Sequence, residues 1–265
     1  MFGRVLVVGG SVDMVGAPVL AGRTALVAGS GLVQIAVPRA ILYPCLSSCL
    51  ELIGLALDGR SSASLARAAE RADAIVVGCG MGTDGASRRR VLDLIAQDKP
   101  LVIDADALNI LASEKSWPTR FQAPAILTPH LGEMKRLGKH LQVSEVPPDE
   151  AGRLDLAGAA ARAFGSVILL KGHRTIVTDG QRTYINKTGD SSLSKAGTGD
   201  VLSGLIGSLV GQGMPLFDAA CLGSWIHGQA GENLGKKLGR RSVLAHQVCD
   251  EIGRVMRQLT RNGDA

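Results

Sequence analysis

Aromatic residues are scarce in this sequence. Phe, Trp and Tyr together make up 3% of its 265 residues, whereas hydrophobic residues as a whole reach 46% and glycine occurs 34 times. A surface that binds nucleic acid by stacking its bases needs aromatic side chains, so this class of function is disfavoured. The composition instead fits a core of small aliphatic side chains joined by tight backbone turns.

Cysteine pairs and long apolar runs are lacking as well. The five cysteines are odd in number and none stands in a CxxC pair. They are Cys45, Cys49, Cys79, Cys221 and Cys249. We therefore expect no disulfide framework and no zinc site, and a reducing compartment, the cytoplasm. Because the longer apolar stretches contain Glu51 or Asp200, we expect neither a signal core nor a membrane span.

Charge of either sign is moderate. The 29 basic and 24 acidic residues leave a net charge of +5 and a pI near 9.1, which favours anionic ligands without specifying one. The densest basic group comprises Lys236, Lys237, Arg240 and Arg241. Without interleaved aromatics this group is typical of a solvated helix end, so no nucleic-acid partner is expected.

Two hydrophobic periods alternate along the chain. Short β-branched runs predict buried strands at 5–8, 32–37, 74–77, 101–103, 125–127 and 167–170. Apolar residues at helical spacing predict intervening helices at 17–28, 64–72, 88–95, 131–137 and 149–164. This alternation predicts an α/β fold with a mainly parallel central sheet and helices on both faces.

The last third of the sequence changes character. Two runs of alternating polar and apolar residues, at 175–178 and 183–185, predict a hairpin at the sheet edge. Apolar residues at helical spacing then predict helices at 200–211, 216–238 and 243–259. An exposed loop is predicted at 143–149. Since no linker, repeat or low-complexity segment divides the chain, we expect a single domain over residues 1–265.

Small, polar or charged residues follow five of the predicted strands. In such sheets the ligand lies beyond the carboxyl ends of the strands, so these residues mark where to look for chemistry. They are Gly9, Gly10 and Ser11; residues 78–82; Asp104 and Asp106; Thr128, Pro129 and His130; and Lys171 and Gly172.

The strongest motif is the glycine-rich turn that leads into the helix at 200–211. A helix N-terminus offers free amides and a positive dipole end, which bind phosphate. Gly197 and Gly199 allow close approach of the backbone, and Asp200 stands where a carboxylate could accept a proton from a substrate hydroxyl. The alternative is that Asp200 merely caps the helix, but capping does not require glycine on both sides of Thr198.

The glycine cluster at 78–85 does not match the dinucleotide fingerprint. Gly78 and Gly80 have the first spacing of GxGxxG, but Thr83 occupies the third glycine position, which disfavours a hydride-transferring dehydrogenase. Four glycines still favour close approach to a ligand. No base adjoins Cys79 in the sequence, so we interpret it as a turn residue and not a nucleophile.

Three further motifs are ambiguous when taken singly. Pro129 restricts Thr128 and directs His130 toward the crevice, although a lone histidine is usually structural. Asp104 and Asp106 could cap a helix or contact magnesium, and capping is favoured. Lys171 and the residues after it suit a nucleotide phosphate or ribose, but a charged strand end is also common.

Taken in order, the motifs resemble the ADP- or ATP-dependent NAD(P)H-hydrate dehydratases, a carbohydrate kinase-like family with a ribokinase-type fold. The match covers nearly the whole chain and includes GLVQIAVP from residue 31. It runs from VVGGSVDMVGAP at residue 7 through VVGCGMG, VIDADALN, ILTPHLGEM and ILLKGHRT to INKTGDSSLSKAGTGDVLSGLIG at residue 185.

The resemblance implies repair of hydrated NADH or NADPH. A nucleotide, ADP more than ATP, would phosphorylate the hydrate hydroxyl, and loss of phosphate would regenerate NAD(P)H, with Mg²⁺ bridging the phosphates and no protein metal ligand assigned. Asp200 would be the catalytic base. The implied hydrate-binding residues are Ala17, Gly80, His130 and Asp200. The implied nucleotide-binding residues are Lys171, Gly172, His173, Arg174, Thr175, Gly197, Thr198 and Gly199.

Three positions depart from the family pattern. Cys79 stands where the family usually has proline, Asp190 where it has asparagine, and Ala196 where it has glycine. Asp190 adds negative charge near a site that binds phosphates and could weaken nucleotide affinity. With Ala196 it leaves a non-catalytic nucleotide sensor as one alternative. A kinase of the same fold for a vitamin-precursor alcohol is another, although the TPHLGE and DADALN segments favour the dehydratase. The resemblance also implies a homotetramer and a separate NAD(P)H-hydrate epimerase as functional partner.

Overall fold

The computed structural model describes residues 2–58, 62–115, 117, 121 and 124–263. Its strands are β1 (Arg4–Val8), β2 (Leu32–Pro38), β3 (Ile53–Leu57), β4 (Ala74–Val77), β5 (Leu101–Ile103), β6 (Ala125–Leu127), β7 (Val167–Leu170), β8 (Ile176–Thr178) and β9 (Thr183–Ile185). Its helices are α1 (Gly16–Val27), α2 (Arg39–Ser48), α3 (Ser62–Arg71), α4 (Gly85–Ile95), α5 (Ala105–Ser113), α6 (Leu131–Leu137), α7 (Glu150–Phe164), α8 (Thr198–Gly211), α9 (Leu216–Leu238) and α10 (Ala245–Gly263), with short 3₁₀ turns η2 (Gly138–Leu141) and η3 (Ser191–Leu193).

All nine strands form one sheet in the order β3-β2-β1-β4-β5-β6-β7-β8-β9. The strands from β3 to β7 are mutually parallel. Strands β8 and β9 are antiparallel and close one edge, as the predicted hairpin requires. The expected α/β architecture with a mainly parallel sheet is therefore confirmed.

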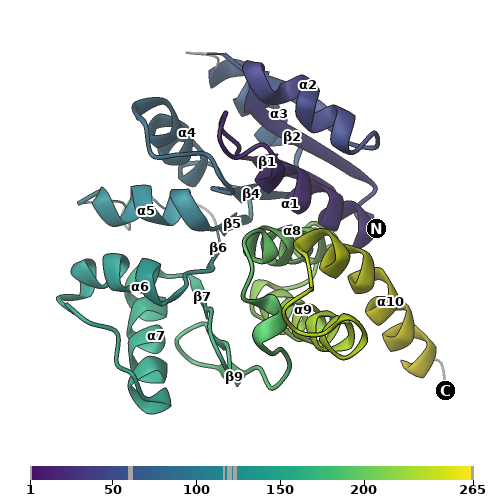
Figure 1. Cartoon of the computed structure of the whole chain (residues 1–265). Coiled ribbons are helices and arrows are strands. Elements are labelled where there is room, and N and C mark those ends of the chain that lie inside the picture. The colour runs from purple at the N-terminus through teal and green to yellow at the C-terminus, as the bar shows by residue number, and fades with distance from the viewer. Residues whose placement is uncertain (1, 59–61, 116, 118–120, 122–123, 264–265) are drawn as a thin grey trace.

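Helices cover both faces of this sheet (Figure 1). Successive side chains of a strand point to opposite faces, so Val5 and Val7 of β1 join one core while Leu6 and Val8 join the other. The first core includes α1, α2, α8, α9 and α10, and the second includes α3 to α7. Burial of the central strands on both faces explains their unbroken aliphatic sequences.

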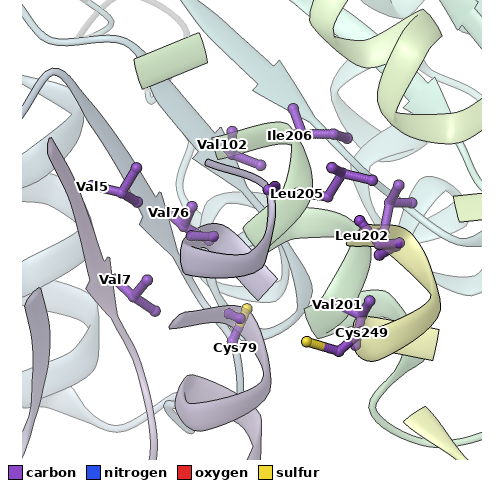
Figure 2. Close-up of a cluster of buried hydrophobic side chains, with 14 of the residues drawn as sticks. Val5, Val7, Val76, Cys79, Val102, Val201, Leu202, Leu205, Ile206 and Cys249 are labelled. Atoms are coloured by element: carbon purple, nitrogen blue, oxygen red, sulfur yellow. The ribbon is translucent and has the colours of Figure 1, made fainter. Parts of the chain in front are cut away.

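Helix α8 lies against the middle of the sheet. Figure 2 shows its side chains Val201, Leu205 and Ile206 in the same cluster as Val76 and Val102 of the strands. A Cβ at Gly204 would lie only 2.1 Å from the carbonyl oxygen of Ala21, so glycine allows α8 to touch the backbone of α1. These contacts fix the N-terminus of α8 above the carboxyl ends of the strands.

Besides the 3₁₀ turns, two helices and one strand of the described ranges were not predicted. Helix α2 contains Pro44, which lacks an amide donor and obscures the helical pattern. Strand β3 is an edge strand that includes Gly54 and exposes Ile53, so it does not read as a buried run. Helix α5 is short and starts among the acidic residues that were singled out as a motif.

The remaining predicted elements are confirmed within a few residues at their ends, and 143–149 is a loop, as predicted. Of the helices in the described ranges, none combines the length and the apolar character that crossing a bilayer requires.

Candidate functional site

The ends of β4 and β5 touch through a glycine. Gly78 follows β4 with a φ of 121°, and a Cβ there would lie 1.8 Å from the carbonyl oxygen of Asp104. Only glycine combines this backbone conformation with this proximity. The contact places Cys79 and Asp104, each at a strand end, in one buried cluster.

A buried ion pair lies at the centre of this cluster. Lys171 Nζ, after β7, is 2.6 Å from Asp104 Oδ1, and the Asp104 side chain is 2% exposed. Asp104 also accepts hydrogen bonds from Ser203 Oγ at 2.7 Å and from the amide of Ala105 at 2.8 Å. Burial alone raises the pKa of Asp104, but Lys171 and the hydroxyl of Ser203 outweigh it and hold the pKa below its usual value.

Lys171 faces a second carboxyl group. Its Nζ is 3.9 Å from Glu133 Oε2 on α6. Burial lowers the pKa of Lys171, but Asp104 and Glu133 more than reverse this, and the ammonium group keeps its charge. Burial raises the pKa of Glu133 to about 7, against the opposing effect of Lys171.

His130 caps α6 instead of pointing freely into the crevice. Its Nδ1 accepts from the amides of Gly132 and Glu133 at 2.9 and 3.2 Å, while Glu133 Oε2 accepts from the amide of His130 at 2.8 Å. This is a capping box, with histidine in the place usually held by serine or threonine. The His130 side chain remains 54% exposed, so its ring can still meet a ligand.

Asp200 lies in the first turn of α8, above the buried cluster. Burial raises its pKa to about 6, and the nearby Asp104 adds to the increase. A hydrogen bond with Cys79 and the charge of Lys171 act in the opposite direction. The Asp200 carboxyl therefore loses its proton near neutral pH, and it is a stronger base than an ordinary aspartate.

Cys79 is buried and protonated. Burial raises the pKa of its thiol well above the usual value, and the carboxylates of Asp200 and Asp104 raise it further. A thiol in this state donates a hydrogen bond and does not attack a substrate. The geometry agrees with the interpretation of Cys79 as a turn residue.

The predicted hydrate-binding residues divide into two groups. Gly80 has a φ of 62°, and a Cβ there would lie 2.9 Å from Cβ of Ala17, so these two residues adjoin. Asp200 joins them through Cys79, which precedes Gly80 in the chain. His130 lies two strands away, where it pairs with Lys171 as an isolated β-bridge.

A cavity of about 410 Å³ borders Thr198 and Gly199 at the start of α8. Its walls come from residues 171–175 after β7, from Asn186, 188–191, Leu193 and Ser194, from Thr198, Gly199 and Leu202 of α8, and from Ser224, His227 and Gly228 of α9. Seven of the eight predicted nucleotide-binding residues line it, and the eighth, Gly197, caps α8 with a φ of 88°. Its volume is within the range of small-molecule sites.

Asp190 forms part of the cavity wall, but its charge is paired. Its Oδ1 accepts from the amide of Ser192 at 2.9 Å, and its Oδ2 accepts from Arg240 Nε at 2.8 Å. Burial raises the pKa of Asp190, yet Ser192 and Arg240 together bring it below its usual value. Arg240, expected only as part of a solvated helix end, therefore offsets the charge that made Asp190 suspect.

Asp106 and Asp104 both have protein partners. Asp106 Oδ2 accepts from the amide of Gly82 at 2.9 Å, and Asp104 caps α5, the role that the sequence favoured. Among the residues that the structure describes, no group of three or more His, Cys, Asp or Glu side chains is placed to hold a metal ion.

Besides the pairing of Asp190 with Arg240, the sequence did not reveal two features of the site. The pairing of Lys171 with Asp104 joins residues 67 positions apart, and nothing in either motif indicates the partner. His227 is buried in the cavity wall within an apolar helix, where a polar residue among small ones was the available signal.

Comparison with known proteins assigns the sequence to one family. Residues 5–254 match the sequence model of the NAD(P)H-hydrate dehydratases. An ADP-dependent (S)-NAD(P)H-hydrate dehydratase of Neisseria meningitidis is 39% identical over 266 residues, which are 97% of this chain and 85% of the relative. A bifunctional NAD(P)H-hydrate repair enzyme of Moorella thermoacetica is also 39% identical over 98% of this chain, but the chain spans only 50% of that relative's length.

Solved structures show the same fold. An ADP/ATP-dependent NAD(P)H-hydrate dehydratase from Bacillus subtilis, co-crystallised with ATP/Mg²⁺, matches with a TM-score of 0.82 and 26% identity over 97% of this chain and 90% of the other. Ribokinase from Arabidopsis thaliana, 11% identical with a TM-score of 0.57 over 95% of this chain and 99% of the other, shares the fold alone and confirms that it is ribokinase-like. The chain therefore belongs to the NAD(P)H-hydrate dehydratase family.

Proposed function

We propose that this protein uses an adenine nucleotide, ADP in preference to ATP, to dehydrate hydrated NADH or NADPH and so to regenerate the reduced cofactor. The observation that carries the proposal is the position of Asp200, a largely buried carboxyl group at the N-terminus of α8 whose pKa burial raises to about 6. Asp200 follows Thr198 and Gly199, which line the nucleotide-sized cavity, in the first turn of α8, and it interacts with Cys79, the residue before Gly80. The ADP preference is supported by the Neisseria meningitidis relative, which is ADP-dependent.

The nucleotide would occupy the cavity of about 410 Å³ with its phosphates against the N-terminus of α8. The first amides of a helix have no partner within the helix and attract anions. A Cβ at Gly199 would lie 3.6 Å from Lys171 Nζ, so the lack of a side chain there leaves the ammonium group close to this turn. Lys171 and the amides together would stabilise the charge on a transferring phosphoryl group.

The hydrate would lie on the Gly80 side of Asp200, with His130 at the outer part of the crevice. Asp200 would accept the proton of the hydrate hydroxyl while that oxygen forms a bond to the terminal phosphorus and the bond to the leaving nucleotide breaks. Departure of inorganic phosphate, with loss of a proton from the neighbouring ring carbon, then restores the ring double bond. At pH 7 Asp200 is mostly ionised, since its pKa is about 6, and it is ready for this role.

Magnesium is part of the proposal, as a counter-ion of the nucleotide phosphates. Asp104 is an unsuitable ligand because its oxygens already bind Lys171, Ser203 and the Ala105 amide. We propose that Mg²⁺ would be held mainly by the nucleotide and would neutralise the charge of its phosphates. The Bacillus subtilis dehydratase, co-crystallised with ATP/Mg²⁺, supports this choice of ion.

The wider setting is also proposed. We propose that the protein works as a single domain in the cytoplasm and as a homotetramer. The bifunctional repair enzyme of Moorella thermoacetica is about twice as long as the matched region, since the match covers 50% of it. We propose that a separate NAD(P)H-hydrate epimerase supplies the companion step for this chain.

An absorbance assay tests the proposed activity. Purified protein, Mg²⁺ and hydrated NADPH are mixed with ADP, with ATP or with no nucleotide, and the near-ultraviolet absorbance of reduced nicotinamide is followed. We expect recovery of absorbance only with a nucleotide, and faster recovery with ADP. In a parallel reaction a vitamin-precursor alcohol replaces the hydrate; a stable phosphorylated product there, with no recovery of NADPH in the first assay, would indicate a kinase instead.

A further inference from the structure

His227 occupies the wall of the nucleotide cavity without an evident role. It lies on α9, is 7% exposed, and lines the cavity beside Gly228 and Thr198. Its ring is hydrogen-bonded to the backbone of Thr198. Its Nε2 atom is buried and has no hydrogen-bond partner in the described part of the chain. A buried polar atom of this kind requires an explanation, because leaving it unpaired costs free energy.

The charge state of the ring limits what Nε2 can do. Burial lowers the pKa of His227 to about 4, the bond to Thr198 opposes this only in part, and the charge of Lys171 lowers the pKa further. The imidazole is therefore neutral at pH 7 and carries one proton. Because the backbone carbonyl of Thr198 accepts a hydrogen bond and Nε2 makes none, the proton is on Nδ1. Nε2 is then a buried, unpaired hydrogen-bond acceptor that belongs to a residue of the cavity wall.

Only a donor group of the ligand can pair with such an atom. Phosphate oxygens and the ring nitrogens of adenine are acceptors, so they would repel the Nε2 lone pair. The remaining donors of an adenine nucleotide are the ribose hydroxyls and the 6-amino group. His227 is bonded to Thr198, the residue with which α8 begins, and the amides of this turn are the proposed phosphate site. The part of the nucleotide next to its phosphates is the ribose.

We propose that Nε2 of His227 accepts a hydrogen bond from a ribose hydroxyl of the bound nucleotide, and that His227 thereby selects ribonucleotides over deoxyribonucleotides. This inference rests on the proposed occupancy of the cavity by a nucleotide. It does not require that the hydrate be turned over. His227 is a specificity residue in this account and takes no part in proton transfer.

The test compares ADP, 2′-deoxy-ADP and 3′-deoxy-ADP in calorimetric binding to wild-type protein and to His227→Asn. The amide nitrogen of asparagine can replace Nδ1 at the Thr198 carbonyl, while nothing replaces Nε2. We expect wild-type protein to bind one of the deoxynucleotides about fivefold to tenfold more weakly than ADP. His227→Asn should bind ADP more weakly by a similar factor. It should no longer distinguish ADP from the deoxynucleotide that wild-type protein binds weakly.

Ser224→Ala is the matched control. Ser224 lines the same cavity on the same helix, but its hydroxyl already donates to the carbonyl of Cys221. The variant should retain the discrimination between ADP and the deoxynucleotide. If it loses the discrimination as His227→Asn does, the effect is a general disturbance of the cavity and the proposal is wrong.

A second measurement avoids any substitution. In wild-type protein with ¹⁵N-labelled histidine, the NMR chemical shift of the unprotonated Nε2 of His227 should change when ADP binds. The change should be smaller with the deoxynucleotide that binds weakly. Equal affinities of wild-type protein for all three nucleotides, or equal Nε2 shifts, would overturn the assignment to the ribose. A wild-type protein that binds none of them would overturn the proposed function as well, whereas selective binding without turnover of the hydrate would remove only the dehydratase.

Discussion

Lys171 Nζ and Asp104 Oδ1 lie 2.6 Å apart, and the Asp104 side chain is only 2% exposed. The pair joins the end of β7 to the end of β5, across β6, and it lies directly beneath the Gly199 turn. The sequence indicated either a nucleotide-binding residue or an ordinary charged strand end at Lys171, and in the structure its ammonium group neutralises a buried carboxylate. One residue therefore connects the stability of the sheet to the charge of the proposed phosphate site.

Removal of Lys171 should destabilise the fold strongly. Lys171→Met leaves the charge of Asp104 buried without its partner, for which we expect a loss of about 3–5 kcal/mol in the free energy of unfolding. Asp104→Asn in the same chain removes the orphan charge and should restore much of this loss. Urea unfolding of the two single variants and the double variant measures the coupling. Additive losses would contradict the account of the pair.

Asp200→Asn should stabilise the fold at neutral pH. The pKa of Asp200 is about 6 in the folded chain against an ordinary value of 3.8. Folding therefore gains most from this group below pH ~4, where it is protonated in both states, and the gain is lost as pH rises through ~6. We expect about 1–3 kcal/mol of added stability at pH 8 and little at pH 4. Thermal unfolding at both pH values provides the measurement, and a destabilised variant at pH 8 would be inconsistent with a costly buried charge.

Arg240→Gln should weaken nucleotide binding, although Arg240 is not among the residues that line the cavity. Asp190 lines the cavity and pairs with Arg240 at 2.8 Å, so the substitution exposes the phosphates to an uncompensated carboxylate. We expect the Kd for ADP to rise about twofold to fivefold at low salt, and less at high salt. Asp190→Asn in the same chain should cancel the effect. Calorimetric titrations that show an unchanged Kd would mean that the Asp190 charge does not reach the ligand.

Gly78→Ala should be far more damaging than Gly82→Ala. Both glycines have positive φ, 121° and 70°, but an added Cβ meets the Asp104 carbonyl oxygen at 1.8 Å in the first case and nothing within 4 Å in the second. Gly82→Ala should cost about 1 kcal/mol from backbone conformation alone, and Gly78→Ala should cost about 3 kcal/mol or more. Denaturant unfolding of the pair separates conformation from contact. Equal losses would show that the β4–β5 contact is not tight.

Sequence patterns predicted the elements whose hydrophobic period is strong. Helices α6 and α9 have the predicted bounds, because their apolar positions run uninterrupted between clear breakers. Helix α2 was missed since Pro44 lies inside it, and β3 was missed since an edge strand is only partly buried. Local pattern cannot report on such tertiary context.

The site was predictable as a set of strand ends but not as a set of contacts. The rule that ligands lie beyond the carboxyl ends identified Lys171 and Asp104 individually, and the glycine-rich turn at a helix N-terminus identified Asp200. It could not tell that Asp104 binds Lys171, or that Asp190 meets Arg240 50 positions away. Such pairings depend on the order of the strands and on helix packing, which no single motif encodes.

The central claim is that Asp200 receives the hydroxyl proton, and single-turnover kinetics of Asp200→Asn test it most directly. With the protein in excess over hydrated NADPH and with ADP and Mg²⁺ at saturating concentration, the rate of NADPH formation is measured for wild-type protein and for the variant, together with the Kd of each ligand. The account predicts a rate lower by about 10²–10⁴-fold with Kd values for ADP unchanged within a factor of about three. A variant that restores NADPH at the wild-type rate would contradict it.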